Sequence, residues 1–347
     1  MRAALLVSIA LIAQPPDATR PSFSDWLAAV RAEAVARGIR PEIVDAALGS
    51  VEEPLPVVIE RDRAQAETVL SLEKYINRAV APKTVKAGRA IVAEHRPLLD
   101  EVSKRYGVPV RIIAGVWGME SSFGRFSGTR PIVAALATLA WDPRRSAFFR
   151  GELFDALEIV NRGDIELPQL RGSWAGAMGQ VQFMPSSYLK FAEDFDGDGR
   201  RDIWSTPADI FASIANYLKG HGWQADQDWG REVKVTPEVA RRIASGVARR
   251  NGGCRATRDM TVALPLARWK ELGVRLLGGK ALPASGPAGA SLVSGSARHF
   301  LVYPNYDALL EYNCANSYAV SVALLGNAVT SAEPARKPSR RTQGSKK

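Results

Sequence analysis

Glu120 is the residue of this sequence whose position most strongly suggests chemistry. It lies four residues after Val116 and eight after Ile112, so the three residues share one stripe of a helix. Pro109 can start that helix and Gly124 can end it. A carboxylate on an apolar stripe faces the interior or a cleft floor, where desolvation raises its pKa and favours proton donation near neutral pH. The competing interpretation is a glutamate near a helix end whose carboxylate faces solvent.

A second segment suited to ligand contact runs from Gly172 to Tyr188. Its glycines let the backbone approach a ligand closely, and polar side chains alternate with aromatic rings that can cover sugar faces. The residues concerned are Ser173, Trp174, Gly176, Gly179, Gln180, Gln182, Phe183 and Tyr188. The same pattern is also typical of a structural turn packed by aromatic residues, and Pro185 then begins another helix.

An acidic loop between two predicted helices matches the beginning of an EF-hand calcium loop. Acids stand at positions one, three, five and nine, and Gly199 stands at position six. Ser205 replaces the glutamate usual at position twelve, so Asp209 is the candidate for the last ligand; alternatively, Asp209 forms a capping box with Thr206. The predicted site is a structural Ca²⁺ site whose ligand set is Asp194, Asp196, Asp198, Arg200, Asp202 and Asp209.

Composition and charge limit the cellular context. The chain has 347 residues, 46% of them hydrophobic, and a net charge of +10. Residues 1–20 have the short basic start and apolar run of an export signal, too short to span a bilayer, with no cysteine for a lipid anchor. These features predict a soluble periplasmic monomer that does not bind nucleic acid. The basic tail, 329–347, is predicted to be disordered and to contact anionic wall or membrane surfaces weakly.

The two cysteines, Cys254 and Cys314, have two interpretations. In an oxidising compartment an even pair favours a disulfide, which would tie an inserted domain to the returning C-terminal segment. The alternative is two buried free thiols. Three histidines, without a cysteine cluster, are too few for a zinc site.

The hydrophobic pattern changes twice along the chain. Helical periodicity dominates residues 21–107 and 108–230, and the second stretch holds every motif described above. Residues 231–299 contain shorter runs, such as Met260–Leu264, that indicate a small inserted domain with strands. A strand and a helix over 300–328 then return to the core. The expected fold class is mainly α, of the α+β type.

Taken together, these segments resemble the lytic murein transglycosylase B family, glycoside hydrolase family 103. The resemblance extends from about Trp26 to Leu325 and implies a lysozyme-like helical catalytic core with extra helices and a small β domain. It is carried by Gly118–Gly124, Gly172–Tyr188, the acidic loop, Ala215–Trp223 and Tyr312–Val320.

By this resemblance Glu120 is the single catalytic acid and base. Residues implied to line the glycan cleft are Ser173, Gln182, Tyr217, Asn313, Tyr312 and Tyr318, with Met178 and Phe183 as further candidates for packing against sugar. The sequence departs from the family pattern at Ala315, where members commonly carry serine. It also has an extra residue between Trp204 and Asp209, which lengthens the acidic loop.

The implied reaction cleaves the β-1,4 bond between N-acetylmuramic acid (MurNAc) and N-acetylglucosamine (GlcNAc) in peptidoglycan, forms a 1,6-anhydro ring, and needs no organic cofactor. Two alternatives remain. A hydrolysing muramidase would need a second carboxylate across the cleft, for which Asp142, Asp155 and Glu166 are nearby in sequence. A non-catalytic wall-binding protein would bind glycan without depending on Glu120.

Overall fold

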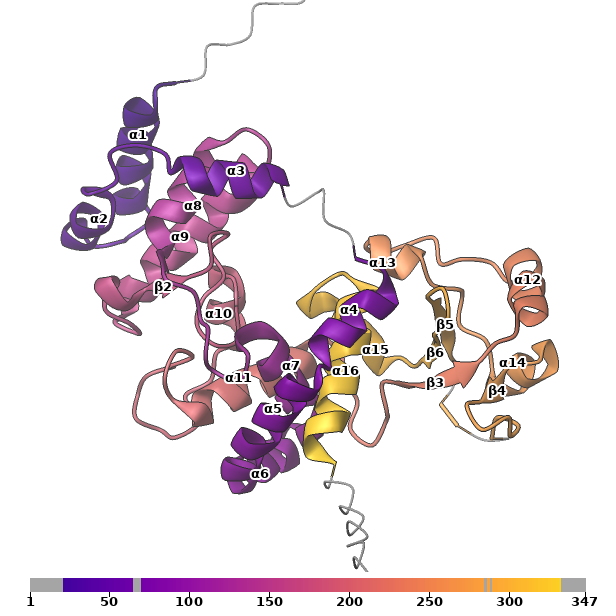
Figure 1. Cartoon of the computed structure of the whole chain (residues 1–347). Coiled ribbons are helices and arrows are strands. Elements are labelled where there is room, and N and C mark those ends of the chain that lie inside the picture. The colour runs from indigo at the N-terminus through magenta and orange to yellow at the C-terminus, as the bar shows by residue number, and fades with distance from the viewer. Residues whose placement is uncertain (1–20, 65–69, 284–285, 288, 332–347) are drawn as a thin grey trace, which may run out of the picture.

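The computed structural model describes residues 21–64, 70–283, 286–287 and 289–331. The predicted export signal lies outside these residues, as does the predicted tail beyond Ser331. Helices make up most of the described chain and short strands a small part, which confirms the prediction of a mainly α fold (Figure 1). Within the described ranges, every helix is too short or too polar to cross a membrane.

The N-terminal helices form two groups that pack on different parts of the molecule. The first group packs on α8 (Ile132–Trp141) and α9 (Ser146–Arg162), and the second on α11 (Pro207–Gly220) and α16 (Asn316–Thr330) (Figure 1). The region predicted as one unit over 21–107 is therefore divided. The first group is α1 (Phe23–Ala36), α2 (Pro41–Leu48) and α3 (Pro56–Ala64), and the second is α4 (Leu72–Ala79), α5 (Pro82–Glu94) and α6 (Arg96–Tyr106).

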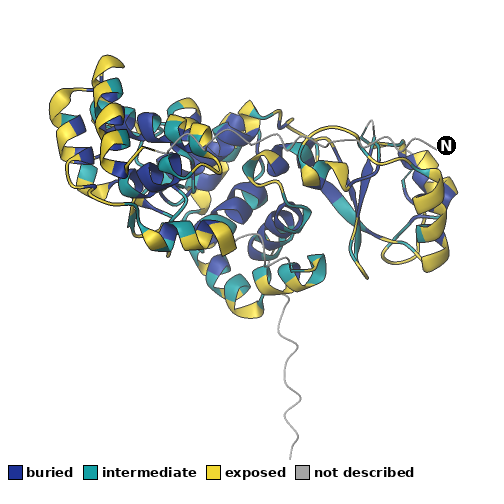
Figure 2. Cartoon of the chain, turned by 90° about the horizontal axis from the view of Figure 1, so that it is seen from above, coloured by how far each residue is buried: buried dark blue, intermediate teal, exposed yellow. Residues whose placement is uncertain are grey.

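Helix α7 (Val110–Ser121) lies in the middle of the molecule and packs along α16. The two backbones approach closely because a Cβ on Gly115 would collide with the carbonyl oxygen of Val322. Figure 2 shows that buried residues are concentrated in the central helices, whereas the outer helices expose one face. Glu120, near the end of α7, is thus carried by a rigidly packed element.

The inserted domain is built on a four-stranded antiparallel sheet with the strand order β4-β3-β6-β5. The strands are β3 (Gly230–Lys234), β4 (Arg275–Leu276), β5 (Ser291–Ser294) and β6 (His299–Val302), and the helices are α12 (Pro237–Gly246), α13 (Arg255–Arg258) and α14 (Leu266–Leu272). Two expectations are corrected. Strand β6, assigned to the returning segment, pairs with β3 and β5 inside this sheet. Residues 260–264 form only isolated bridges, at Thr261 and Leu264.

The alternation of side chains along β6 explains why this strand connects two cores. Phe300 and Val302 belong to the main core, whereas Leu301 and Tyr303 belong to a smaller core of the inserted domain. Successive strand residues point to opposite faces of a sheet, so one strand serves both cores. The inserted domain is therefore packed against the body of the protein and also has its own interior.

The C-terminal segment forms two helices, not the single helix predicted after the strand within 300–328. Helix α15 (Asn305–Tyr312) ends before Asn313, and α16 begins at Asn316 and continues to Thr330, past the predicted start of the tail. In the break between them, Cys314 forms a disulfide with Cys254 at the start of α13, with a Cα–Cα distance of 6.2 Å. The disulfide joins the inserted domain to the break between the two helices.

Candidate active site

The stripe predicted for α7 runs from the core to Glu120, one residue before the end of the helix. Ile112 and Val116 are fully buried, whereas Glu120 at the same face is partly exposed. The helix ends at Ser121, three residues before the predicted end at Gly124, because Ser122 adopts a left-handed φ of 52°. The apolar stripe therefore fixes the helix in the core and leaves its last acid accessible.

The environment of Glu120 suits it to exchange a proton near neutral pH. Burial among protein atoms raises the pKa of its carboxyl from 4.5 to about 7, although the hydrogen bond that the Tyr318 hydroxyl donates to Oε1 acts in the opposite direction. Tyr318 lies on α16, 198 residues further along the chain. The close packing of α7 and α16 brings the two groups together.

The charge of Glu120 acts on four tyrosines, of which Tyr318 bonds to it directly. Burial first, and then the charge of Glu120, raise the pKa of Tyr75 and hold the pKa values of Tyr312 and Tyr318 well above 10. Burial and the charges of Glu311 and Glu120 raise the pKa of Tyr217 to about 12. All four phenols therefore stay protonated and can donate hydrogen bonds. Tyr75, on α4, was not among the predicted site residues, because no local motif around it distinguishes it from an ordinary helix residue.

The glycine-rich segment forms a tightly bonded loop beside α7, between β2 (Arg171–Gly172), which pairs with β1 (Arg130–Pro131), and α10 (Pro185–Phe191). A short 3₁₀ turn, Leu167–Gln169, precedes it. Trp117 Nε1 donates to Gln180 Oε1 at 2.8 Å, which joins the loop to α7. Gly179 has a φ of 64°, and a Cβ there would lie 2.6 Å from the carbonyl oxygen of Ile203. The glycine is therefore required by the conformation and by the neighbouring backbone.

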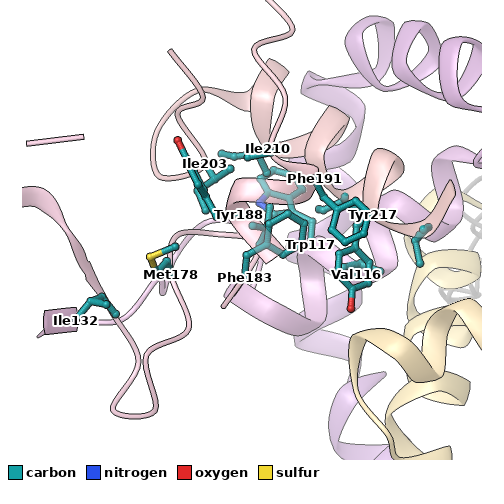
Figure 3. Close-up of a cluster of buried hydrophobic side chains, with 14 of the residues drawn as sticks. Val116, Trp117, Ile132, Met178, Phe183, Tyr188, Phe191, Ile203, Ile210 and Tyr217 are labelled. Atoms are coloured by element: carbon teal, nitrogen blue, oxygen red, sulfur yellow. The ribbon is translucent and has the colours of Figure 1, made fainter. Parts of the chain in front are cut away.

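The predicted cleft residues occupy two kinds of position. Gln182 and Phe183 line a hollow of about 200 Å³ together with Tyr217 and Tyr312, and Figure 3 shows the rings of Phe183 and Tyr217 next to each other. Ser173 lies in the loop, where its Oγ accepts hydrogen bonds from the backbone N–H groups of residues 175 and 177.

Two other predicted cleft residues, Asn313 and Met178, are not part of the lining of this hollow. Asn313 is exposed in the break before α16. Met178 has 0% exposure and exchanges backbone hydrogen bonds with Phe183, so in this structure it packs beneath the loop and presents no surface to a sugar. The burial of Met178 is a correction to its predicted role, because sequence does not distinguish a residue that lines a cleft from one that supports the lining.

Hydroxyl groups of the tyrosines also hold the walls of this hollow. The Tyr217 hydroxyl donates to the carbonyl oxygen of Glu311 at 2.8 Å, and the Tyr312 hydroxyl donates to that of Val181 at 3.0 Å. The side-chain amide of Gln182 donates to the carbonyl oxygens of Ser127 and Gly179. These bonds connect α11, α15 and the glycine-rich loop around the hollow.

A buried carboxylate that the sequence analysis did not predict also lines the hollow. Glu152, on α9, is 4% exposed, and burial raises its pKa. It accepts hydrogen bonds from the backbone N–H of Ser186 at 2.9 Å and from the Ser186 hydroxyl at 2.7 Å. Both of its oxygens are therefore used to fix the first turn of α10. Asp142, one of the sequence candidates, instead lies 3.8 Å from Arg63 in an ion pair.

In the acidic loop, three of the predicted ligands lie together. Asp194, Asp196 and Asp209 each place a carboxylate oxygen within 4.8 Å of the others. Asp209 is fully buried, and burial together with the charges of Asp196 and Asp194 raises its pKa to about 6. Thr206 makes no side-chain cap, and Asp209 accepts from the N–H groups of Phe195 and Asp202, so the capping-box interpretation does not hold.

The remaining predicted ligands lie outside this group of three. Asp202 accepts hydrogen bonds from the N–H groups of Trp204 and Ser205, and Asp198 accepts from the N–H of Arg200 at 2.8 Å. Carboxylate oxygens grouped in this way are the ligands that Ca²⁺ prefers. The cluster that fits a cation is therefore smaller than the predicted set and includes the distant Asp209.

Comparisons with known proteins agree with this geometry. A profile of the family described as "Transglycosylase SLT domain" matches residues 22–327. The membrane-bound lytic murein transglycosylase B of Escherichia coli (strain K12) is 34% identical over 265 residues, which cover 74% of this chain and 66% of that protein. The matched part thus spans slightly less than two thirds of that relative.

Solved structures are similar over most of the chain. SltB3 from Pseudomonas aeruginosa, in complex with NAG-anhNAM-pentapeptide, has a TM-score of 0.79 and 39% identity, and covers 89% of this chain and 79% of that one. The Escherichia coli lytic transglycosylase Slt35, in complex with calcium, has a TM-score of 0.73 and 28% identity, and covers 87% and 92%.

The fold and the cleft define a lysozyme-like transglycosylase architecture, with one helix-borne glutamate among tyrosines. The chain belongs to the transglycosylase SLT domain family. The resemblance to the lytic murein transglycosylase B family is thereby confirmed.

Proposed function

We propose that the protein is a peptidoglycan lytic transglycosylase with Glu120 as its catalytic acid and base. The observation that carries the proposal is the carboxyl of Glu120, which is partly exposed near the end of α7, has a pKa raised by burial to about 7 and accepts a hydrogen bond from the Tyr318 hydroxyl. A group with this pKa can both give and recover a proton near pH 7. One related protein is named as a lytic murein transglycosylase, and another as a lytic transglycosylase. Both names support the same reaction.

In the proposed first step, protonated Glu120 donates its proton to the glycosidic oxygen that leaves with GlcNAc, while positive charge develops on C1 of MurNAc. The N-acetyl group of the substrate shields C1. In the second step, the Glu120 carboxylate takes the proton of the MurNAc C6 hydroxyl as this oxygen bonds to C1. The 1,6-anhydro ring is closed, Glu120 is again protonated, and no water is consumed.

The partners of two other carboxylates, Glu152 and Asp142, favour this reaction over hydrolysis by a muramidase. An enzyme with two catalytic carboxylates needs a second one that is free to act across the cleft. Glu152, which lines the hollow, has both oxygens bonded to Ser186. Asp142 is paired with Arg63 and also accepts a hydrogen bond from the backbone N–H of Arg144. Among the described residues, the side chain that is hydrogen-bonded to the Glu120 carboxylate is that of a tyrosine, Tyr318, and not of a second acid.

The test is digestion of purified peptidoglycan followed by mass measurement of the products. We expect anhydromuropeptides, lighter by one water than muramidase products, and none from Glu120→Gln. The matched control is Glu94→Gln, an exposed carboxylate on α5, which should digest normally. Reducing-end muropeptides as the main product would favour the muramidase. Glycan binding without any product, unchanged in Glu120→Gln, would favour the non-catalytic wall-binding protein.

We also propose that the acidic loop holds a structural Ca²⁺ ion. The grouping of Asp194, Asp196 and Asp209 supports it, because three carboxylates this close repel one another without a cation. Asp198 and the carbonyl of Arg200 are the next candidate ligands by loop position. The ion would fix the connection between α10 and α11, and α11 carries Tyr217.

We propose, finally, that the protein acts in the periplasm after export. The apolar segment within residues 1–20 and the cysteine pair support this location. A monomer whose basic tail contacts anionic surfaces is expected. Fractionation of cells that produce the full chain tests the location, and recovery from the cytoplasm would overturn it. Sedimentation of the purified protein tests the monomer.

A further inference from the structure

A recess of about 620 Å³ lies between α5 and the last turn of α16. Side chains between Lys86 and Arg96 line one side of it and residues 329–331 line the other, and Figure 1 shows the C-terminal end of α16 beside α5. Its volume is within the usual range for a small-molecule site. Its lining shares no residue with the hollow at Tyr217 and Tyr312, so the proposed reaction leaves it without a role.

The packing of α7 on α16 places this recess away from Glu120. The Tyr318 hydroxyl, near the start of α16, donates to Glu120 near the end of α7. Further along α16, Gly326 packs against the carbonyl of Arg111 near the start of α7, so the two helices run antiparallel. Val329 follows Tyr318 by eleven residues, which is roughly 16 Å along a helix. The recess therefore lies at the end of this helix pair opposite to the Glu120 carboxylate.

The charged residues that line the recess are all basic. Arg89 is half-buried, and its Nε donates to the carbonyl oxygen of Ala328 at 2.9 Å, which fixes the guanidinium at the end of α16. The Nε of Arg96 donates to both carboxylate oxygens of Asp100 at 2.9 Å. Lys86 is exposed and makes no ion pair or hydrogen bond within the described part of the chain. Three cations around one recess repel one another, so an anion between them is stabilised.

A lipid phosphate suits this lining in both charge and polarity. The planar forks of the two arginines and the ammonium of Lys86 match the oxygens of a phosphate group. The lining is apolar at Ala90, Ala93 and Val329. A free phosphate would leave these walls in contact with water, whereas the glycerol and first methylene groups of a phospholipid would cover them. The recess is therefore complementary to the headgroup region of an anionic lipid.

The sequence that follows the recess is also basic. Ser331 is in the lining and is the last described residue of the chain. Residues 332–347 contain one acid, Glu333, and six basic residues, which are Arg336, Lys337, Arg340, Arg341, Lys346 and Lys347. A membrane surface that contains anionic lipids attracts each basic residue that lies near it. Such a surface can bind the recess and the sequence that begins at its rim together.

We propose that this recess binds the phosphate group of an anionic phospholipid through Lys86, Arg89 and Arg96, and so attaches the protein to a membrane surface. Attachment there leaves the opposite end of the helix pair, with Glu120, free to reach glycan. The inference does not depend on the reaction proposed for Glu120, because the recess is remote from that carboxylate and lipid binding needs no substrate.

The experiment measures binding of the full chain to lipid vesicles by flotation at about 0.1 M salt, where the Debye length is about 10 Å. The vesicles contain phosphatidylcholine and phosphatidylglycerol in equal amounts, or phosphatidylcholine alone. Lys86→Glu is compared with Lys280→Glu, which makes the same change of charge at an exposed lysine of the inserted domain. Arg96→Gln is compared with Arg241→Gln, because both arginines are exposed and form an ion pair within their own helix.

We expect Lys86→Glu to weaken binding to the mixed vesicles about twenty-five-fold, because it changes two units of charge and each contributes roughly five-fold. Arg96→Gln should weaken binding about five-fold, and both controls should stay within about two-fold of the wild type. The wild type should not bind vesicles of phosphatidylcholine alone. Inorganic phosphate added at constant ionic strength should leave vesicle binding unchanged, because it cannot replace the apolar contacts. Both target positions are exposed, so Lys86→Glu and Arg96→Gln should unfold at the wild-type temperature.

Three results would overturn the proposal. Equal losses in Lys86→Glu and Lys280→Glu would mean that net charge, and not the recess, attracts the protein to the vesicles. Release from the vesicles by inorganic phosphate at constant ionic strength would assign the recess to free phosphate. A loss of binding to purified cell-wall sacculi or to double-stranded DNA in Lys86→Glu, with vesicle binding unchanged, would assign the recess to an anion of the wall or of nucleic acid.

Discussion

Replacing Glu120 by glutamine should stabilise the protein above neutral pH, in addition to abolishing cleavage. Burial raises the pKa of this carboxyl from 4.5 to about 7. The folded state therefore binds the proton more tightly than the unfolded state, and stability is lost as the pH rises from 4.5 through 7. Above pH 7 the buried charge costs up to about 3 kcal/mol, from 1.36 kcal/mol per pKa unit. Glutamine has no charge, and its side-chain oxygen can still accept the hydrogen bond from Tyr318.

The assay is thermal unfolding of the wild type and Glu120→Gln at pH 4 and pH 8. The midpoints should agree at pH 4, where the wild-type carboxyl is protonated in both states, and differ by about 5 °C in favour of the variant at pH 8. Glu94→Gln, at an exposed carboxylate, controls for general charge effects. An equal difference at the two pH values would refute the reasoning, because it would mean that the charge of Glu120 is not desolvated.

Further predictions concern activity, the acidic loop, the inserted domain and the disulfide. Because Glu120 must be protonated to act first, kcat/KM should fall as the pH rises above about 7; a rate still rising at pH 9 would contradict this role. Calcium should raise the melting temperature of the wild type but not that of Asp209→Ala, and identical curves with and without calcium would exclude the site. Glu73→Gln should weaken the contact of α4 with the turn before β6, where the carboxylate accepts from the N–H groups of Ala297 at 2.9 Å and Arg298 at 3.2 Å. The loss should be about 1–2 kcal/mol by thermal unfolding, and no change would mean that α16 alone holds α4. Reduction of the disulfide, which closes a loop of 60 residues, should cost about 4 kcal/mol; two free thiols titrated in the oxidised, denatured protein would show that the bond does not form.

Local patterns were sufficient to predict the elements that carry the chemistry. The apolar stripe through Ile112 and Val116 predicted both the helix and the orientation of Glu120, because helical periodicity relates spacing directly to a shared face. The acidic loop after α10 was likewise recognised from the sequence, because the spacing of its acids and glycines lies within one short segment. Local patterns did not predict that α15 and α16 are separate helices, because the run Asn313–Ala315 contains neither glycine nor proline to mark the break.

Long-range contacts explain what sequence could not provide. Tyr318 is 198 residues from Glu120, and only the packing of α7 on α16 makes their side chains neighbours. Tyr75 lies near the end of α7 because α4 packs on α16, away from the first three helices that precede it in the chain. Such contacts depend on how apolar faces of distant segments fit together, and periodicity does not encode that fit. The sequence by itself predicted Glu120 as the candidate acid and predicted the helix that carries it. The tertiary structure decided its pKa and its tyrosine partner, because burial and charge are properties of the assembled surroundings.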